Sequence, residues 1–250
     1  MMAKKIRADV LLVERGLVAS REKARALILA GKVFVGEQRV DKAGDQLLAE
    51  TVLTVRGEDH AYVSRGGVKL EGALDAFAYD PHGKVFADFG ASTGGFTDCL
   101  LQRGATRAYA IDVGYGQLHQ KLRVDSRVVV MERTNARHLT ATSLPQLVDL
   151  VVIDASFIGL AKLLPAARAV LRARGDVIAM VKPQFEVGRD AIGKNGVVRD
   201  EDARRKAIDD VSAFANGLGL REKMRADAVI RGPEGNHEAF LWLVRDENAV

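Results

Sequence analysis

The chain has 250 residues, of which 48% are hydrophobic and 28% charged, with a formal net charge of +4 at pH 7. This composition suits one full α/β domain with a small second domain, and it excludes a disordered or fibrous protein. A single cysteine excludes an internal disulfide framework, and the N-terminal sequence lacks the apolar run of a secretory signal, so we expect a cytoplasmic protein without a membrane-spanning helix.

The positive charge is concentrated near the N-terminus. Residues 1–42 contain ten lysines and arginines against five acidic residues, an excess of +5. Such a segment is suited to a polyanionic partner, although a solvated basic surface would give the same excess.

The first predicted elements are two short helices and a hairpin. The segment RADVLLVERGL has apolar residues at Val10, Leu11, Val13 and Leu17, which predicts a short amphipathic helix that ends near Gly16. A second helix is expected to begin after Ser20, a natural N-cap, and to end near Gly31. The segment KVFVGEQRV then predicts two short strands joined at Gly36 and Glu37.

This order of elements, with basic residues on the second helix, resembles the α+β RNA-binding fold named after protein four of the small ribosomal subunit. The resemblance covers about residues 6–53. It implies phosphate contacts, which position RNA without reading its sequence. The side chains that it assigns to such contacts are Arg7, Arg21, Lys23, Arg25 and Lys32, and we add Arg65 from the connector that follows. For each residue taken singly, a solvated helix face is an equally good interpretation.

A second domain follows this connector. The segment 55–67 ends just before a helical pattern, VKLEGALDAF, which places the domain boundary near residue 60. From Lys84 onward, the apolar segments KVFADFG, ATRAYAIDVG, VDLVVIDAS and GDVIAMVKP each precede a helical pattern. This alternation predicts a doubly wound, mainly parallel α/β sheet, whose ligands bind at the loops after the strands.

The first of these strands leads into a glycine-rich loop, DFGASTGGFT, over residues 88–97. Glycines let the backbone approach a ligand closely before a helix begins. The spacing differs from GxGxxG and there is no Walker lysine, which disfavours a nicotinamide or P-loop site. The pattern DxGAxxGGF instead resembles the S-adenosylmethionine loop of FtsJ-like ribose methyltransferases.

The resemblance implies a set of cofactor-binding residues. Asp112, 22 residues after Gly90, follows the second strand, where an acid can accept both ribose hydroxyls; an N-capping aspartate is the alternative. Asn135 lies in the segment MERTNAR, which follows a further strand located between the segments ATRAYAIDVG and VDLVVIDAS. The adenine edge would lie there, but a turn-forming asparagine is equally compatible. The loop itself contributes Asp88, Gly90, Ala91, Ser92, Thr93, Gly94, Gly95 and Phe96.

Four ionisable residues occur beside different strands of the predicted sheet: Lys69, Asp154, Lys182 and Glu238. Their local sequences SRGGVKL, VIDASFIGL, MVKPQFEVG and GNHEAFLWL resemble the TlyA family, and the similarity spans essentially the whole chain. That family comprises ribosomal RNA 2′-O-methyltransferases acting on cytidine riboses, some of which carry the historical label haemolysin. The resemblance therefore implies a Rossmann-like class I methyltransferase that uses S-adenosylmethionine on ribosomal RNA or a ribosomal subunit.

Roles for these four residues follow from the reaction. Methyl transfer to a ribose hydroxyl needs near-linear alignment and removal of the hydroxyl proton. We assign Lys182 as the general base or hydroxyl-orienting group, with Asp154 holding it in place. Lys69 and Glu238 would steer the ribose and its flanking phosphate. A structural salt-bridge network at the sheet edge is the alternative.

The domain boundaries that follow are an RNA-binding domain over residues 1–59, a linker over 60–67 and a methyltransferase domain over 68–250. The chain ends soon after its last predicted strand, which favours 23S ribosomal RNA of the large subunit as the substrate, with 16S RNA as a second target. The five histidines lack metal-ligand spacing, so no metal is expected. Cys99 and Trp242 are expected in the core, whereas Tyr62 and Tyr115 could line a substrate groove or simply pack.

Parts of the sequence are compatible with three other functions, to different degrees. A catalytically silent ribosome-binding factor could use the same N-terminal domain. A pseudouridine synthase can begin with this RNA-binding fold, but it needs a β-rich catalytic domain that residues 85–200 do not provide. A pore-forming toxin needs secretion and a membrane-inserting element, and the sequence offers neither.

Overall fold

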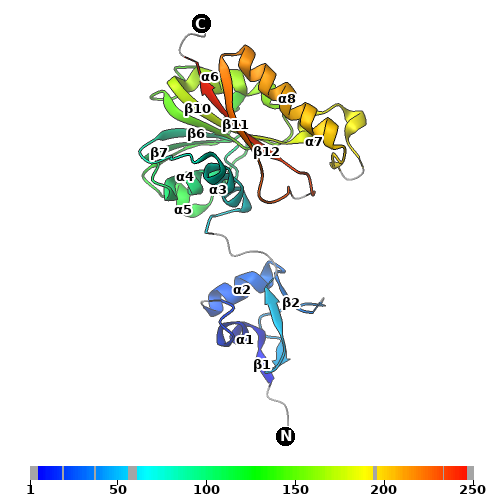
Figure 1. Ribbon diagram of the computed structural model, residues 1–250. Coiled ribbons are helices and arrows are strands. Elements are labelled where there is room, and N and C mark those ends of the chain that lie inside the picture. The colour runs from blue at the N-terminus through cyan, green and yellow to red at the C-terminus, as the bar shows by residue number, and fades with distance from the viewer. Residues whose placement is uncertain are drawn as a thin grey trace. The chain divides into compact units, whose positions relative to one another are not determined.

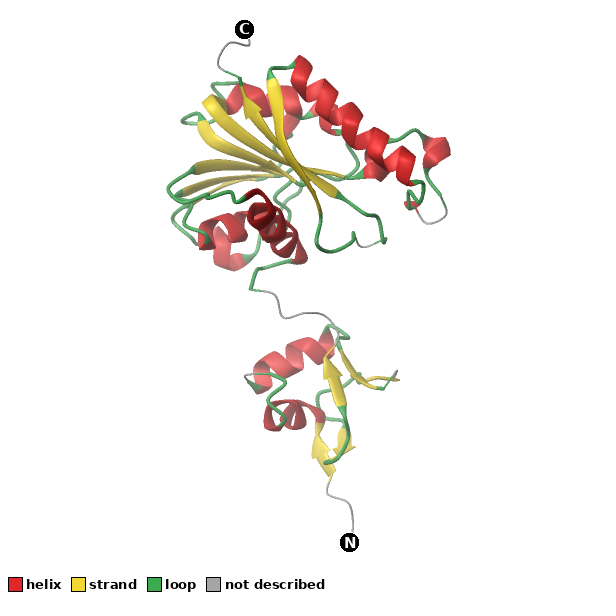
Figure 2. Ribbon diagram, in the orientation of Figure 1, coloured by secondary structure: helices red, strands yellow, loops and turns green. Residues whose placement is uncertain are grey.

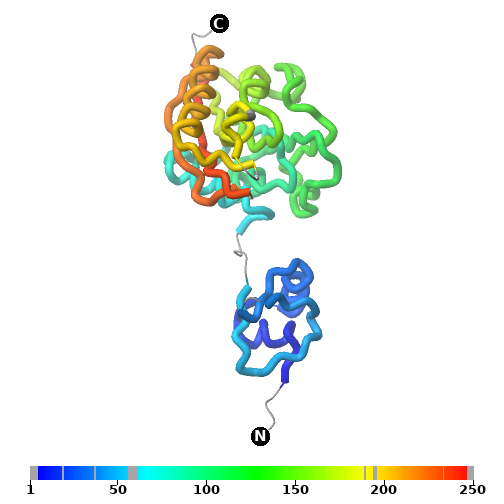
Figure 3. Tube along the Cα trace, turned by 90° about the vertical axis from the view of Figure 1, so that its right-hand side faces the viewer, coloured from blue at the N-terminus to red at the C-terminus, as the bar shows by residue number. Residues whose placement is uncertain are grey.

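The computed structural model describes residues 5–18, 20–36, 38–55, 61–193, 196–232 and 234–246, without the side chain of Arg189. The chain divides into two compact units, residues 1–59 and 60–250, each of which is described by itself (Figures 1 and 3). In the described ranges, no helix is both long and apolar enough to span a bilayer.

In its described residues, the first unit contains two helices and two small antiparallel sheets. Strand β1 pairs with β4, and β2 lies between β3 and β5. Ser20 caps the second helix by accepting a hydrogen bond from the Lys23 amide at 3.2 Å, as the sequence predicts. The elements are β1 (Lys5–Arg7), α1 (Ala8–Glu14), α2 (Arg21–Leu29), β2 (Val33–Val35), β3 (Gln38–Arg39), β4 (Gln46–Leu48) and β5 (Leu53–Val55).

The predicted amphipathic helix is present as α1, and the core of this unit shows which of its residues are buried. Of the four apolar residues named from the sequence, Leu11 is buried, Val10 and Val13 are half-buried, and Leu17 is 41% exposed. The buried face is Ala8, Leu11 and Leu12, which have the i, i+3, i+4 spacing of one helical face. The full cluster contains Ala8, Leu11, Leu12, Val18, Ala24, Ile28, Val33, Val40 and Leu53.

The second unit is built on a seven-stranded sheet with the order β11-β12-β10-β9-β6-β7-β8. Neighbours from β10 to β8 run parallel, whereas β12 is antiparallel to both β10 and β11. The mainly parallel, doubly wound sheet predicted from the sequence is therefore confirmed. Its strands are β6 (Val85–Phe89), β7 (Arg107–Ile111), β8 (Val128–Met131), β9 (Val148–Ile153), β10 (Leu171–Val181), β11 (Leu220–Asp227) and β12 (Ala239–Arg245).

Helices cover both faces of this sheet (Figures 1 and 2). On one face lie α3 (Arg65–Phe77), α4 (Gly95–Gln102) and α5 (Gln120–Arg123), and on the other lie α6 (Leu164–Val170), α7 (Pro183–Glu186) and α8 (Glu201–Gly217). Three short 3-10 helices, η1 (Ala136–His138), η2 (Leu160–Lys162) and η3 (Arg189–Ala191), complete the elements of the described ranges. The predicted helix GQLHQKLR is helical only over its last four residues.

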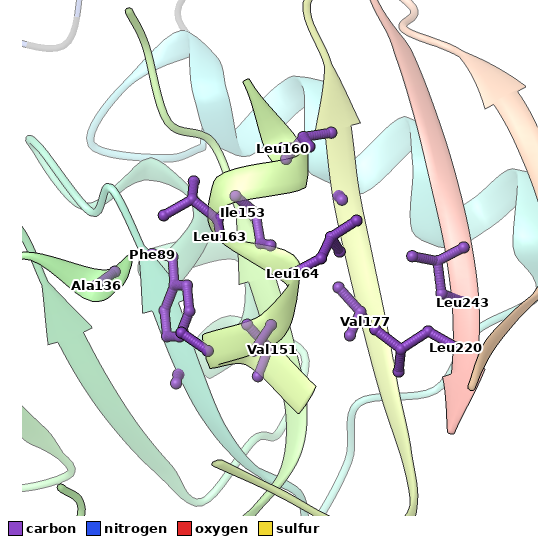
Figure 4. Packing of buried hydrophobic residues seen from close by; sticks show 14 of the residues in the cluster. Phe89, Ala136, Val151, Ile153, Leu160, Leu163, Leu164, Val177, Leu220 and Leu243 are labelled. Carbon is purple, nitrogen blue, oxygen red and sulfur yellow. The ribbon is translucent and has the colours of Figure 1, made fainter. Parts of the chain in front are cut away.

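The strands bury side chains on both faces, as a parallel sheet covered by helices requires. Phe89, Ile153 and Val177 pack with Leu163 and Leu164 on the α6 side (Figure 4). The alternate residues of the same strands, such as Phe86, Val152 and Ile178, pack against α3 and α4 in a second cluster. Cys99 and Trp242 belong to that second cluster, which confirms their predicted place in the core.

The separate cores give a first testable prediction. Leu11 is 1% exposed in the first unit, and Leu11→Ala should cost about 2–5 kcal/mol of unfolding free energy, a large share of what so small a core supplies. Leu29→Ala on α2, where Leu29 is 89% exposed, should change the melting temperature little. Scanning calorimetry of the full chain should show the Leu11→Ala loss in one transition only, because each hydrophobic cluster of the described residues belongs to a single unit. A matching shift of both transitions would contradict independent folding.

Candidate active site

A cavity of about 680 Å³ lies at one edge of the seven-stranded sheet. Its walls are the loops after β6, β9 and β10, the start of α3 and the segment before β12. The parallel strands β6, β9 and β10 all end at this edge, and because β12 is antiparallel to β10, its beginning joins them. The topology thus gathers segments far apart in the sequence around one space.

The four predicted ionisable residues all line this cavity, in two pairs. Nζ of Lys182 lies 2.7 Å from Oδ1 of Asp154, and it donates a hydrogen bond to Oγ of Ser156 at 2.8 Å. Lys69 donates to Glu238, and both of these side chains are buried. Buried charges of opposite sign need each other, because removing one partner leaves the other charge uncompensated at a cost of several kcal/mol.

The glycine loop between β6 and α4 forms the next wall. Gly90 has a φ of +87°, and a Cβ atom added there would lie 2.9 Å from the carbonyl oxygen of Asp154. Gly94 has a φ of +95°, and a Cβ atom would lie 2.2 Å from a methyl group of Leu122. Both positions therefore require glycine for conformation and for space. The loop residues that line the cavity are Asp88, Gly90, Ala91, Ser92, Thr93, Gly95 and Phe96.

Asp88 places an unpaired carboxylate oxygen in the same region. Its Oδ2 accepts hydrogen bonds from the Thr97 amide at 3.1 Å and the Thr97 hydroxyl at 2.7 Å. Its Oδ1 is buried without a hydrogen-bond partner among the described residues. Burial, helped by the nearby charge of Asp154, raises the pKa of Asp88 to about 7. A buried, unpaired acceptor beside a cavity fits a cationic donor such as the ammonium group of S-adenosylmethionine.

Asp112 follows β7, at the same edge but beside a separate, much smaller pocket of about 10 Å³. Its two carboxylate oxygens accept from the amides of Ser92 at 2.9 Å and Gly114 at 2.7 Å. The exposed side chain of Gln117 lines this pocket and accepts a hydrogen bond from the Ser92 hydroxyl at 3.3 Å. An adenosyl group bound at Asp112 would therefore require Gln117 to turn aside.

Asn135 is exposed and caps η1 by accepting a hydrogen bond from the Arg137 amide at 3.2 Å. It is not among the residues that line either pocket. Its observed contacts are thus those of the turn-forming alternative, and contact with an adenine edge stays a prediction.

Several residues that line the cavity were not predicted from the sequence, among them Ser156, Phe157 and Phe185. Ser156 binds Lys182, and Phe157 and Phe185 form an aromatic pair with ring centroids 5.3 Å apart. Phe157 is 91% exposed and has a φ of +64°, a strained conformation for a bulky side chain. The available signal was position alone, because Ser156 and Phe157 follow Asp154 by two and three residues.

Buried Asn236 organises the opposite wall. Its side chain accepts from the Val198 amide at 3.0 Å and donates to the Gly196 carbonyl at 3.0 Å. It thereby ties the segment before β12 to the segment after α7, and both segments border the cavity. A polar residue in a glycine-rich string gave no signal for this role in the sequence.

The predicted RNA-binding residues are divided between the units. Arg7, Arg21 and Arg25 lie in the first unit, where all three bind the carboxylate of Asp9. Lys23 is exposed on α2, and Lys32 is half-buried just beyond that helix. Arg65 begins α3 in the second unit, lines the cavity and donates to the Arg231 carbonyl at 2.9 Å.

Tyr62 and Tyr115, which could each pack or line a substrate groove according to the sequence, differ in their exposure. Tyr62 is buried and donates a hydrogen bond to Glu71 at 2.6 Å, so it packs. Tyr115 is 68% exposed, and the Arg133 guanidinium lies 4.2 Å from its ring centroid. Over the described ranges, His, Cys, Asp and Glu form no group of three that could hold a metal ion, and His60 lies outside those ranges.

The chain matches two protein-family models and is similar to proteins of named function. The model of the FtsJ-like methyltransferase family matches residues 62–245, and that of the S4 domain matches residues 6–53. The chain is 48% identical to the 16S/23S rRNA (cytidine-2′-O)-methyltransferase TlyA of Mycobacterium tuberculosis, over 97% of this chain and 91% of that protein. It is 33% identical to the 23S rRNA (cytidine-2′-O)-methyltransferase TlyA of Campylobacter jejuni, over 94% and 98%.

Solved structures share the fold of this chain. A protein from Streptococcus thermophilus described as a hemolysin superposes with a TM-score of 0.76 at 42% identity, covering 99% of this chain and 90% of that chain. Solved structures of S-adenosylmethionine-dependent methyltransferases, such as one from Listeria monocytogenes with a TM-score of 0.55 at 13% identity, share the fold of the second unit.

The unpaired oxygen of Asp88 gives a second prediction. Since the pKa of Asp88 is raised to about 7, the carboxylate is largely protonated at lower pH and ionised above that value. Affinity for S-adenosylmethionine should therefore rise roughly five- to tenfold between about pH 6 and pH 7.5, as the charge that pairs with the ammonium group appears. Isothermal calorimetry at several pH values measures this, and in Asp88→Asn the rise should vanish. An affinity of the unmodified protein that stays constant or falls over this range would exclude the contact.

Proposed function

The chain belongs to the FtsJ-like methyltransferases and, among them, to the TlyA family, and we propose that it transfers the methyl group of S-adenosylmethionine to the 2′-hydroxyl of a cytidine in ribosomal RNA. The observation that carries the proposal is the pair of lysine–carboxylate contacts, Lys182 with Asp154 and Lys69 with Glu238, facing one cavity beside the glycine loop. The hydrophobic clusters that pack the sheet lie on its two faces.

We propose 23S RNA of the large subunit as the principal substrate. The names of the Mycobacterium and Campylobacter relatives share 23S RNA, whereas 16S RNA occurs only in the first, which supports 16S RNA as a second target. The match of residues 6–53 to the S4 domain supports RNA as the partner of the first unit. Since ribosomes are cytoplasmic, we place the activity there.

Lys182 orients and deprotonates the ribose hydroxyl. Its amine is held from two sides, by the charge of Asp154 and by the hydroxyl of Ser156, so its direction is fixed before a substrate arrives. The neutral amine accepts the hydroxyl proton as the new carbon–oxygen bond forms, and the charged amine can only donate to the oxygen. Bound S-adenosylmethionine supplies the electrophilic methyl group.

The remaining residues position the two reactants. The exposed Arg65 at the edge of the cavity provides a cation for the phosphate next to the target ribose, and Lys69, held by Glu238, donates hydrogen bonds to the ribose or to that phosphate. Asp88 accepts from the ammonium group of the cofactor, and the glycines let the backbone come close to it. Together these contacts hold the hydroxyl near the methyl group.

Phe157 supports a nucleobase as the neighbour of the reacting ribose. The Phe157 ring is 91% exposed although a strained backbone holds it, so most of its surface is available to a ligand. Bases taken out of an RNA stack are commonly held on aromatic side chains. The adjacent ring of Phe185 supports Phe157 from the loop that also carries Lys182.

Lys182 provides the decisive test. Lys182→Ala should lower single-turnover methylation of ribosomal subunits by at least about a hundredfold, because the proton acceptor is lost, while S-adenosylmethionine affinity changes little. Lys182→Arg should fail as well, since a guanidinium does not release its proton near neutral pH. The measurement is transfer of a radiolabelled methyl group, with calorimetry of cofactor binding for each variant.

Lys162→Ala, an exposed lysine of the neighbouring η2, serves as the matched control and should keep the full rate. If Lys182→Arg retains most of the rate, proton acceptance is excluded and Lys182 only binds the substrate through its charge. If the unmodified protein binds the cofactor and the ribosome without turnover, it acts as a binding factor and the enzymatic proposal fails.

Phe157 gives a separate prediction. Phe157→Ala should reduce the methylation rate by about ten- to a hundredfold through loss of stacking, without weakening cofactor binding. Phe214→Ala, which removes a 41% exposed ring on α8, should have no effect on the rate. Single-turnover rates of both variants decide the matter, and an unimpaired Phe157→Ala enzyme would show that the ring contacts no base.

A further inference from the structure

Three arginines of the first unit converge on one buried carboxylate. Asp9, on α1, is completely buried. Its oxygens accept hydrogen bonds from Arg7 at 3.0 and 3.2 Å, from Arg21 at 3.1 Å and from Arg25 at 3.2 Å. The arginine side chains are themselves 43%, 51% and 58% exposed. The anion therefore lies beneath a surface made of guanidinium groups.

The arrangement joins two helices. Arg7 precedes α1, whereas Arg21 and Arg25 lie one turn apart on the same face of α2. Without an anion between them, three guanidinium groups at this distance would repel one another and turn toward solvent. The hydrogen bond with Arg7, followed by those with the other two, holds the pKa of Asp9 well below its usual range, so the carboxylate stays ionised at working pH.

The cluster of Asp9 with Arg7, Arg21 and Arg25 can still bind an additional anion. Three positive charges and one negative charge leave a formal charge of +2 at a single exposed place. Each guanidinium has five N–H donors in a rigid fork, and Asp9 occupies two from Arg7 and one each from Arg21 and Arg25. The fork matches the oxygens of a phosphate, which it can bind with two parallel hydrogen bonds.

We propose that Asp9 is a positioning residue, which holds Arg7, Arg21 and Arg25 as one preorganised site for neighbouring phosphodiester groups of structured RNA. The proposal rests on the proposed function for the identity of that RNA, and it assigns to an acidic residue a positive contribution to RNA binding. An ordered cluster binds more tightly than three separate arginines, because the side-chain entropy has been lost before the RNA arrives.

This reasoning leads to an expectation opposite to that from charge alone. Asp9→Asn keeps the size of the side chain and raises the net charge by one, so a surface that acts only through summed charge should bind RNA more tightly. If the arginines must be held together, the same change should weaken binding. Asp41 offers the matched control, since it pairs with Arg39 at 2.7 Å in the same unit and both side chains are well exposed.

The experiment compares full-length Asp9→Asn and Asp41→Asn with the unmodified protein in filter binding to transcribed 23S RNA over a salt series. We expect the dissociation constant of Asp9→Asn to rise about tenfold, with a slope against log salt that is shallower by about one phosphate contact. Asp41→Asn should bind as well as the unmodified protein or slightly better. Binding by Asp9→Asn that equals or exceeds that of Asp41→Asn would overturn the proposal.

A second pair of variants covers the case in which Asp9→Asn unfolds the first unit, which calorimetry would reveal. Arg25→Lys keeps the charge but loses the planar fork, and it should weaken RNA binding several-fold, whereas Arg39→Lys should not. Equal binding by these two variants would also overturn the proposal. Methylation assays on the same proteins separate the two ideas: if the unmodified protein transfers no methyl group but the binding differences persist, only the proposed function fails.

Discussion

The close approach of two backbones at Gly90 is the constraint on which the candidate site depends. A side chain at this position would collide with the carbonyl of Asp154, so the loop after β6 can lie against the loop after β9 only because Gly90 has no Cβ. The same contact puts the glycine loop beside the residue whose carboxylate holds Lys182. One backbone position thereby couples the wall expected to hold the cofactor to the group expected to meet the ribose.

Charge at this edge of the sheet is costly to maintain. Lys69 and Glu238 are buried together, and Asp88 is buried with one oxygen unpaired, although hydrophobic residues would fill the same space at lower cost. The parallel sheet can carry this cost, because its two faces bury large clusters on α3 and α4 and on α6 and α8. Hydrophobic packing on the faces of the sheet thus leaves its edge free for the buried charged residues of the candidate site.

The sequence predicted what depends on periodic or compositional signals. The parallel strands were recognisable because they contain short apolar runs. The loop at residues 88–97 was recognisable because three glycines follow such a run within a few residues, a pattern typical of a tight turn between a strand and a helix. Strand β11 was missed, since LREKMRAD at the edge of the sheet buries almost nothing and so has no apolar pattern. Phe157 and Asn236 were missed for a different reason, because a single loop residue has a function only through neighbours that the fold brings to it. From the sequence, Asp9 only lowers the net positive charge of its segment. In the structure it is buried, and three of the arginines that make up this charge surround it.

Both units use one physical device, a carboxylate that fixes cations, and they differ in the cation. Around Asp9 the cations are arginines, which stay protonated and present flat, forked donors suited to the oxygens of a phosphate. In the cavity they are lysines, each paired with one acid, and an amine can lose its proton where a guanidinium cannot. A surface that only binds RNA gains from a permanent charge, whereas a group that accepts a proton must be able to exist without one. Arginines around Asp9 and a lysine at position 182 therefore agree with the different roles that we propose for them, phosphate binding and proton acceptance.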